Sequence, residues 1–236
     1  MANDYSDTWY KVFLQPVPAR QTESEIAFIT CNLPRPSCQS IVDLCCGNGR
    51  HTRLLADKGY QVTGVDNNAQ VLEQAKALSD PRISYISLDM RRISDLQGTY
   101  DALVCLWQSF GYFDDMTNLD ILRQIGQKLN PKGRLMLDIY NRAFFEKYQG
   151  ERSFQKEGIT VIEHKAMSGN RLKVSLTYSN DAKADIFDWQ LFYPDELAED
   201  LAPVGFKRLL ACTGFDEKQP PSPDKPRMQL VFEKIS

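Results

Sequence analysis

One segment restricts the possible folds of this chain more than any other. The apolar run Ile41–Cys45 enters the turn Cys46-Gly47-Asn48-Gly49, and a helical pattern begins at Arg50. A strand that passes through a glycine turn into a helix is typical of sheets whose parallel strands are joined by crossover helices. Glycines there let backbone and ligand approach closely, and the start of the helix presents free N–H groups. The segment therefore predicts a ligand site at a sheet edge.

The alternation of short apolar runs with amphipathic stretches continues to about residue 140. Five such steps within roughly a hundred residues predict a doubly wound parallel sheet. Asn68 is a suitable N-cap for one of the helices. The expected strands are 41–45, 61–66, 83–86, 101–106 and 134–139, and the expected helices are 50–58, 69–78 and 118–129.

The spacing of apolar residues then changes to a two-residue repeat, in which Leu172, Val174, Leu176 and Tyr178 alternate with polar side chains. This repeat indicates an antiparallel strand. Turn-like sequences separate it from its neighbours, so residues 151–193 are expected to form an antiparallel β meander inserted after the fifth strand. The insertion is too small to be a domain, and we expect a single domain over 1–236. The later elements are predicted at 194–202 (helix), 206–212 and 228–234 (strands), with a proline-rich loop at 219–226.

Residues 1–39 combine aromatic side chains with a probable helix at 21–31. The aromatic residues are Tyr5, Trp9, Tyr10 and Phe13. Two interpretations stay open for them: packing in the core, or a flap over a ligand.

Composition excludes several classes of protein. Hydrophobic residues make up 42% and charged residues 25% of the chain, as in ordinary globular domains. A net charge of -3 gives no basic excess for nucleic acid. No apolar run is long enough to span a membrane, and the start resembles no signal peptide, so we expect a cytoplasmic protein. The six cysteines have no C-x-x-C pair and only two histidines accompany them, so we expect reduced thiols and no metal.

Three aspartates follow or lie near strand ends around the glycine turn: Asp43, Asp66 and Asp89. Asp66 can accept from the hydroxyls of a ribose, and Asp89 from an adenine amino group. Asp43 would repel a pyrophosphate and favour a cation. In addition, Thr52 occupies the position where a dinucleotide site has its third small residue. The set fits an adenosine that carries a sulfonium better than it fits NAD, whose dehydrogenases remain a weaker alternative.

With these motifs the chain resembles the class I S-adenosylmethionine-dependent methyltransferases from about residue 40 onward. The resemblance implies a Rossmann-like, doubly wound sheet of seven strands, the last one antiparallel, with S-adenosylmethionine as the cofactor. It places the methionine moiety at the glycine turn, the ribose at Asp66 and the adenine at Asp89 and Met90. The pair Cys45-Cys46 departs from the usual small residues, but the backbone makes that contact. The expected cofactor-binding residues are Asp43, Cys45, Gly47, Gly49, Asp66, Asn67, Asp89, Met90 and Leu106.

The segment Leu106–Phe113 follows the fourth strand, where the methyl acceptor is expected. It lacks the Asp/Asn-Pro-Pro-Tyr and Pro-Cys motifs of enzymes that methylate DNA bases or glutamine. This part resembles the small-molecule N-methyltransferases, such as the amino-sugar dimethyltransferases and glycine N-methyltransferase. We therefore expect a small-molecule acceptor, an amine in first place. The alternatives are an O-methyltransferase acting on a carboxylate or phenol, and a non-catalytic module that binds S-adenosylmethionine.

Four residues are candidates for contact with the reacting groups. Trp107, Tyr112 and Tyr10 can face the sulfonium or an amine through cation–π contacts, or can simply pack. His164, on the same strand face as Ile162, can act as a general base or face solvent. Asp138 and Tyr140 are further acceptor contacts. The meander itself can serve as a lid or as the contact of a homodimer.

Overall fold

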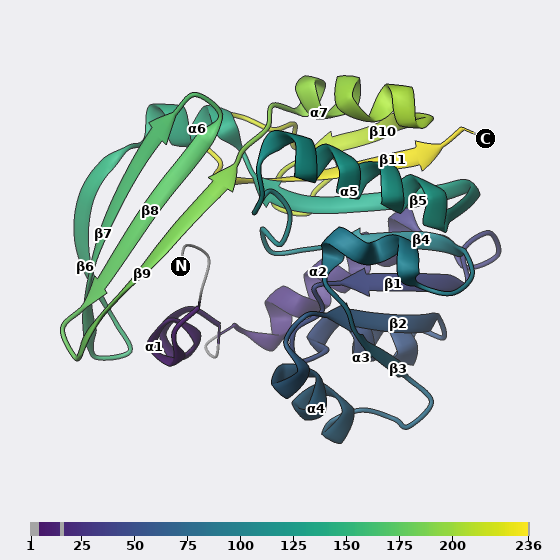
Figure 1. Cartoon of the computed structure of the whole chain (residues 1–236), viewed down its shortest axis with the longest axis horizontal. Coiled ribbons are helices and arrows are strands. Elements are labelled where there is room, and N and C mark those ends of the chain that lie inside the picture. The colour runs from purple at the N-terminus through teal and green to yellow at the C-terminus, as the bar shows by residue number, and fades with distance from the viewer. Residues whose placement is uncertain (1–4, 15–16, 236) are drawn as a thin grey trace.

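The computed structural model describes residues 5–14 and 17–235, and its main element is a seven-stranded sheet with the order β10-β11-β5-β4-β1-β2-β3 (Figure 1). The pairs within β5-β4-β1-β2-β3 are parallel, and β11 is antiparallel to both β5 and β10. The predicted fold class is thereby confirmed. The strands of this sheet are β1 (Ser40–Leu44), β2 (Gln61–Asp66), β3 (Ser84–Ser87), β4 (Tyr100–Cys105), β5 (Leu129–Tyr140), β10 (Phe206–Cys212) and β11 (Arg227–Lys234).

Helices cover both faces of the main sheet because successive residues of its central strands point to opposite sides. Ile41 packs with α2 and α3, whereas its neighbour Val42 packs in the core that includes α5 and α7. The strands are therefore apolar on both faces, which is typical of parallel sheets. The helical elements are α1 (Asp7–Trp9), η1 (Tyr10–Leu14), α2 (Ala19–Asn32), α3 (Arg50–Asp57), α4 (Ala69–Ala77), η2 (Met90–Asp95), α5 (Asp115–Lys128), α6 (Arg142–Lys147), α7 (Pro194–Leu201) and η3 (Ala202–Val204).

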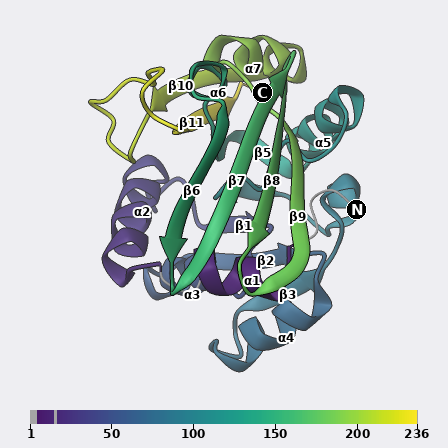
Figure 2. The ribbon, with the colours of Figure 1, turned by 90° about the vertical axis from the view of Figure 1, so that its left-hand side faces the viewer.

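The predicted meander is a separate four-stranded antiparallel sheet with the order β6-β7-β8-β9. One face carries a third apolar core, to which Val12 contributes, while Ile162 and Ile186 on the other face are exposed. Figure 2 shows the sheet from its outer side, with α1 beneath one end of its strands. The strands are β6 (Gly150–Lys156), β7 (Ile159–Ser168), β8 (Arg171–Tyr178) and β9 (Asp181–Gln190).

Two elements begin three or more residues before their expected starts. Helix α5 begins at Asp115, three residues earlier than expected, because the Asp114 side chain accepts from Thr117 N and caps it. Strand β5 begins at Leu129, five residues before the expected start at 134, and contains an irregularity where Lys132 has a φ of 63°.

Within residues 5–14 and 17–235, no helix is long and apolar enough to cross a membrane.

Candidate functional site

The turn between β1 and α3 folds across the carboxyl end of β2. Cys46 N donates to Val65 O at 3.0 Å, and Gly49 N donates to Cys46 O at 3.0 Å. Cys45, Gly47 and Gly49 have φ values of 61°, 54° and 75°, in the left-handed region. The turn thus needs positive φ at three positions, and glycine supplies two of them without steric cost.

The two glycines of this turn have different surroundings. A Cβ at Gly49 would lie 2.3 Å from the Tyr85 hydroxyl oxygen, so Gly49 is needed for close packing against β3. A Cβ at Gly47 would meet nothing within 4 Å. Only Gly47 therefore faces open space at the sheet edge, where a ligand can approach the backbone.

Asp66 ends β2 and is half-buried. Its Oδ2 accepts from Gly47 N at 2.9 Å, and its Oδ1 accepts from Asn68 N at 2.9 Å. Each carboxylate oxygen keeps a further lone pair for another donor, such as a hydroxyl. Asn67 is exposed beside it, and Asn68 caps α4 as predicted, accepting from Gln70 N and Val71 N. The carboxylate is thereby fixed in place at the edge of the sheet.

Asp43 lies inside β1, just before the glycine turn. It is only 3% exposed, and Thr52 Oγ1 donates to its Oδ2 at 2.6 Å. Burial raises the pKa of Asp43, while the charge of His51 and the hydrogen bond from Thr52 oppose that rise. Asp43 therefore ties the first turn of α3 to β1. Thr52, which the sequence marked only as a departure from the dinucleotide pattern, is the partner in this contact.

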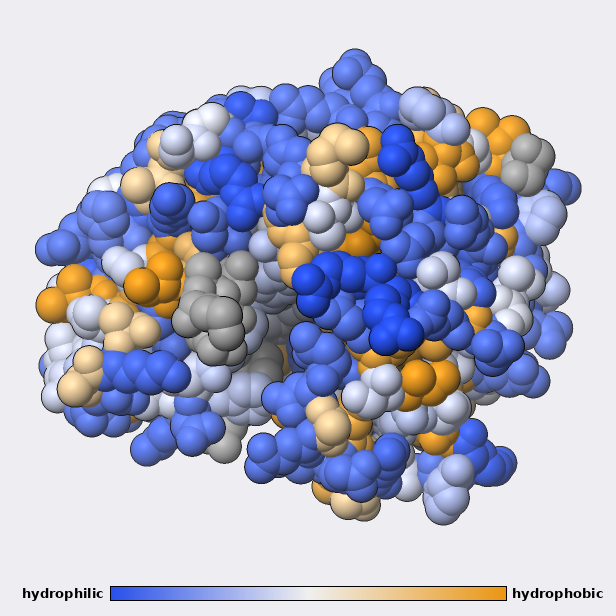
Figure 3. Space-filling view, in the orientation of Figure 1, coloured by the Kyte–Doolittle hydropathy of each residue, from blue (hydrophilic) through white to orange (hydrophobic). Residues whose placement is uncertain are grey.

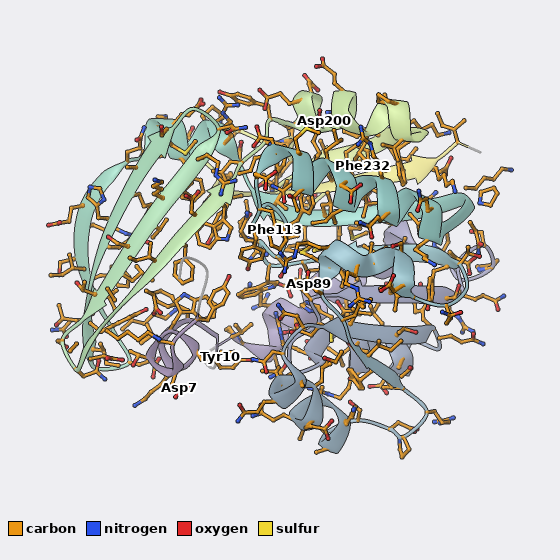
Figure 4. All side chains as sticks on the ribbon, viewed as in Figure 1. Asp7, Tyr10, Asp89, Phe113, Asp200 and Phe232 are labelled. Atoms are coloured by element: carbon orange, nitrogen blue, oxygen red, sulfur yellow. The ribbon has the colours of Figure 1, made fainter. Side chains whose placement is uncertain are left out.

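Asp89 follows β3 and is already paired. Arg91 donates to its Oδ1 from the backbone at 2.9 Å and from Nε at 3.0 Å, and these bonds lower the pKa of Asp89. Met90 beside it and Leu106 after β4 are each 5% exposed. Figure 4 shows Asp89 and Phe113 near one another, and the Arg91 guanidinium carbon lies 4.9 Å from the Phe113 ring centroid. The predicted adenine contacts thus form part of a packed surface.

A cavity of about 520 Å³ lies between the second sheet and the main sheet. Its size is within the usual range for small-molecule sites. Aromatic side chains are the largest group in its wall, and the face of the molecule drawn in Figure 3 is hollowed near its centre. The aromatic residues are Tyr5, Trp9, Phe13, Trp107, Tyr140, Phe144, Phe145, Phe187 and Trp189.

Trp107, one of the four predicted reaction-site residues, lines this cavity and is held by several contacts. Its backbone N donates to Asp138 Oδ2 at 2.9 Å, and its indole Nε1 donates to Glu25 Oε1 at 2.9 Å. The guanidinium carbons of Arg50 and Arg227 lie 4.8 Å and 4.6 Å from its ring centroid. The cation–π contacts expected of Trp107 are therefore made with two arginines of the chain itself.

Tyr10 and Tyr112 are not among the residues that line the cavity, but each ring lies near one that is, Trp9 for Tyr10 and Trp189 for Tyr112. Tyr10 is half-buried, and burial together with the charge of Asp66 raises its pKa. The Tyr112 hydroxyl forms a hydrogen bond with that of Tyr5, and its ring centroid lies 6.4 Å from that of Trp189. The expected flap segment thus both packs on the second sheet and lines the cavity, through Tyr5 and its neighbours.

The structure does not bring His164 to the cavity. His164 is exposed, and it alternates along β7 with Glu163 and Lys165, which line the cavity. Side chains two residues apart on a strand share a face, so His164 and Ile162 share the outer face. The predicted role of His164 as a general base is therefore wrong, and the alternative of a solvent-facing histidine is confirmed.

Sequence reasoning missed Glu25, which lies at the centre of a buried polar cluster. Its carboxylate contacts His51 Nε2 at 2.6 Å and Arg50 at 3.3 Å, besides the indole of Trp107. Burial alone would raise the pKa of Glu25, but His51 and Arg50 hold it below its usual value. The signal that was available is a charged residue on the apolar face of α2, next to Ile26.

Comparisons with known proteins agree with this geometry. The family model described as a methyltransferase domain matches residues 41–133. "Putative methyltransferase YqeM" of Bacillus subtilis (strain 168) is 28% identical over 82% of this chain and 83% of its own length. The chain is a class I S-adenosylmethionine-dependent methyltransferase.

One further relative and one solved structure with a similar fold have named activities. The glycine/sarcosine N-methyltransferase of Halorhodospira halochloris is 27% identical over 80% of this chain and 73% of its own length. The structure of CalS10 with bound S-adenosylmethionine, an amino pentose methyltransferase from Micromonospora echinaspora, superposes with a TM-score of 0.70. It covers 99% of both chains at 19% identity, and so shows the same fold. As a member of this family, the methyltransferase uses S-adenosylmethionine as its cofactor.

Proposed function

We propose that this methyltransferase transfers the methyl group of S-adenosylmethionine to an amine of a small molecule bound in the aromatic cavity. The observation that carries the proposal is the position of Trp107. It lines the cavity and also contacts Arg50, the first residue of the helix that follows the glycine turn. The named activities of two relatives, which act on glycine or sarcosine and on an amino pentose, support an amine.

For the cofactor, we propose a binding site along the edge from the glycine turn to Asp89. Gly47 leaves open space for the ligand, and Asp66 offers two fixed carboxylate oxygens to the ribose hydroxyls. Asp89 and Met90 form the expected adenine side, Leu106 is a further expected contact of the cofactor, and Asp43 acts through Thr52 by fixing the start of α3. When bound, the cofactor supplies an electrophilic methyl group on a positively charged sulfur.

The chain's own contribution to the reaction is to orient the acceptor and to exclude water. Orientation of two reactants can lower a barrier by roughly 7 to 11 kcal/mol in favourable cases. The aromatic wall of the cavity, including the N-terminal residues Tyr5 and Trp9, removes water from the acceptor. The amine has to react in its neutral form, and Tyr140 stays protonated because burial and the charge of Glu163 raise its pKa to about 12. Tyr140 can therefore donate a hydrogen bond but cannot serve as the base near neutral pH.

The cofactor site is tested with the variant Asp66→Ala in a calorimetric titration with S-adenosylhomocysteine. We expect affinity to fall at least tenfold, because hydrogen bonds to a charged group contribute roughly 1.5 to 3 kcal/mol. The control is Asp57→Ala, an exposed carboxylate on α3, which should bind like the wild type. Equal affinity of wild type and Asp66→Ala would remove Asp66 from the site.

The acceptor class is tested by incubating the enzyme with methyl-labelled S-adenosylmethionine and paired amines, carboxylates and phenols. Mass spectrometry of the products then shows which atom carries the label. Labelled N-methyl products support the proposal. Label on oxygen only would replace the amine by an O-methyl acceptor, and cofactor binding without label on any acceptor would favour the non-catalytic module.

A further inference from the structure

The part of the acceptor cavity wall that β6 and β7 form carries four of its five charged side chains. Arg152 and Lys156 face the cavity from β6, and Glu163 and Lys165 face it from β7. Arg227, on the opposite side, is paired with buried Asp138. The β6–β7 wall therefore holds three cations and one carboxylate, an excess of positive charge beside the aromatic part of the cavity.

The single carboxylate cannot neutralise this wall. Arg152 and Lys165 both pair with the same oxygen, Glu163 Oε2, the lysine at 3.0 Å. The side chains of Lys165 and Glu163 are only 15% and 12% exposed, so solvent screens them weakly. Lys156 lies 5.0 Å from the Phe13 ring centroid, and no carboxylate pairs with it among the residues that the structure describes.

A second observation at the same place points to an oxygen-bearing ligand. Trp189 lines the cavity and is 5% exposed, and within the described part of the chain its buried indole Nε1 has no hydrogen-bond partner. Aromatic contacts connect it to the charged wall: Trp189 lies 5.4 Å from Tyr140, Tyr140 lies 4.9 Å from Phe145, and Lys165 lies 5.5 Å from the Phe145 ring. A buried donor without an acceptor costs free energy, which a ligand oxygen would recover.

We propose that the methyl acceptor carries an anionic group, a carboxylate or a phosphate, bound by Lys156, Lys165 and Arg152, with its nucleophilic end toward Trp107. This inference rests on the proposed function, since it describes the ligand of the same cavity. Charge-assisted hydrogen bonds from these cations hold the anion. The excess positive charge also favours the neutral form of an amine on the same molecule, because like charges oppose its protonation. Neutral amine is the form that accepts a methyl group.

The experiment measures the binding of simple anions to the enzyme saturated with S-adenosylhomocysteine, by calorimetry at low ionic strength. The probes are benzoate, phenyl phosphate, the neutral benzamide and the cation benzylammonium. We expect one or both anions to bind at least tenfold more tightly than benzamide, and added salt to weaken that binding. Preference between benzoate and phenyl phosphate distinguishes a carboxylate from a phosphate.

Two lysine variants test whether the anion binds at the β6–β7 wall. Lys156→Gln and Lys165→Gln should each reduce anion affinity about tenfold, because each removes a charged hydrogen-bond donor. The matched control is Lys173→Gln, an exposed lysine on the outer face of β8, which should bind the anions like the wild type. Thermal unfolding of each variant checks that the fold is intact, and Lys156→Gln breaks no ion pair that the structure shows.

Three results would overturn the inference: equal binding of benzoate, phenyl phosphate and benzamide, tighter binding of benzylammonium, or the same loss in Lys173→Gln as in the two cavity variants. Binding of none of the probes also counts against it. In each of these cases the cofactor part of the proposed function would still hold if the wild type binds S-adenosylhomocysteine and Asp66→Ala binds it more weakly. The product analysis above tests its acceptor part independently.

Discussion

At the scale of single residues, the two glycines of the turn between β1 and α3 are needed for different reasons. Gly47 faces open space, whereas Gly49 is enclosed by Tyr85. Both have positive φ, which costs an L side chain roughly 1 to 2 kcal/mol. Glycine therefore leaves open space beside the backbone at Gly47 and allows close packing at Gly49.

We expect the variant Gly49→Ala to lose more stability than Gly47→Ala. The first adds a contact at 2.3 Å to the cost of positive φ, and so should lower the free energy of unfolding by about 2 kcal/mol or more. Gly47→Ala should lose about 1 kcal/mol, with a larger effect on S-adenosylhomocysteine affinity. Urea unfolding and calorimetry measure the two effects. Equal stabilities of the two variants would contradict the distinction.

Because the pKa of Tyr140 is raised, the free energy of unfolding should fall at alkaline pH. Its pKa is about 12 in the folded protein, above the ordinary value of 10.0. Folding therefore favours the neutral phenol. The contribution of Tyr140 to the free energy of unfolding is fully present below pH 10 and is lost as pH rises through 12. Two pKa units correspond to about 2 to 3 kcal/mol. Between about pH 10 and 12 the wild type should lose more free energy of unfolding than Tyr140→Phe, in urea titrations at fixed pH steps. Parallel losses would show that Tyr140 is not the group responsible.

At the scale of elements, the N-terminal segment is attached to the second sheet by a buried carboxylate. Asp185 on β9 accepts from Ser6 N at 3.1 Å, from Ser6 Oγ at 2.7 Å and from the Tyr178 hydroxyl at 2.6 Å. Ser6 in turn caps α1. These bonds hold Trp9 against Phe187, with ring centroids 6.2 Å apart. A short segment of low intrinsic stability thereby becomes part of the cavity wall.

The variant Asp185→Ala should release this segment. It leaves three donors without their acceptor, two from Ser6 and one from Tyr178, so we expect a loss of about 2 kcal/mol or more in unfolding free energy. Cleavage of residues 5–14 by a protease should also become faster than in the wild type. Asp181→Ala is the control; it removes one bond from the Thr8 hydroxyl and one from the Lys183 backbone at an exposed turn, and should cause a much smaller change. Unchanged cleavage in Asp185→Ala would show that other contacts hold the segment.

Much of the element pattern was predictable from sequence, because period and capping are local properties. The alternation in Leu172–Tyr178 identified the second sheet, and the Asn68 cap of α4 is confirmed. The early start of α5 was missed because the Asp114 cap is polar and the apolar pattern begins only further along. Which face of β7 covers a cavity was not predictable, because either face of a half-polar strand can be the inner one.

At the scale of the whole molecule, the two candidate sites are joined by residues from distant parts of the chain. Glu25 from α2, His51 from α3 and Trp107 after β4 meet in one buried cluster, and Arg227 of β11 stacks on Trp107. Burial lowers the pKa of the Arg227 guanidinium to about 10, which leaves it charged near neutral pH. Trp107 therefore contacts both the helix that follows the glycine turn, through Arg50, and the cavity that it lines.

Binding at this joint site should stabilise the whole fold. A ligand at 100 times its dissociation constant adds about 2.7 kcal/mol, which corresponds to a melting temperature higher by about 5 to 11 °C for a chain of this size. We expect this rise with S-adenosylmethionine and S-adenosylhomocysteine but not with NAD, in parallel thermal unfolding experiments. A rise with NAD alone would contradict the assignment of the acidic strand ends.

The sequence by itself determined the sheet, its glycine turn and the aspartates at its edge, because these follow from the order of strands and turns along the chain. Parallel strands bring their carboxyl ends together whatever surrounds them, so Asp66 had to lie beside the turn. Only the tertiary structure decided the acceptor side. Glu25, Lys156 and Trp189 come from elements whose contact depends on how the second sheet folds over the first. Such contacts depend on packing between distant segments, and no local pattern encodes them.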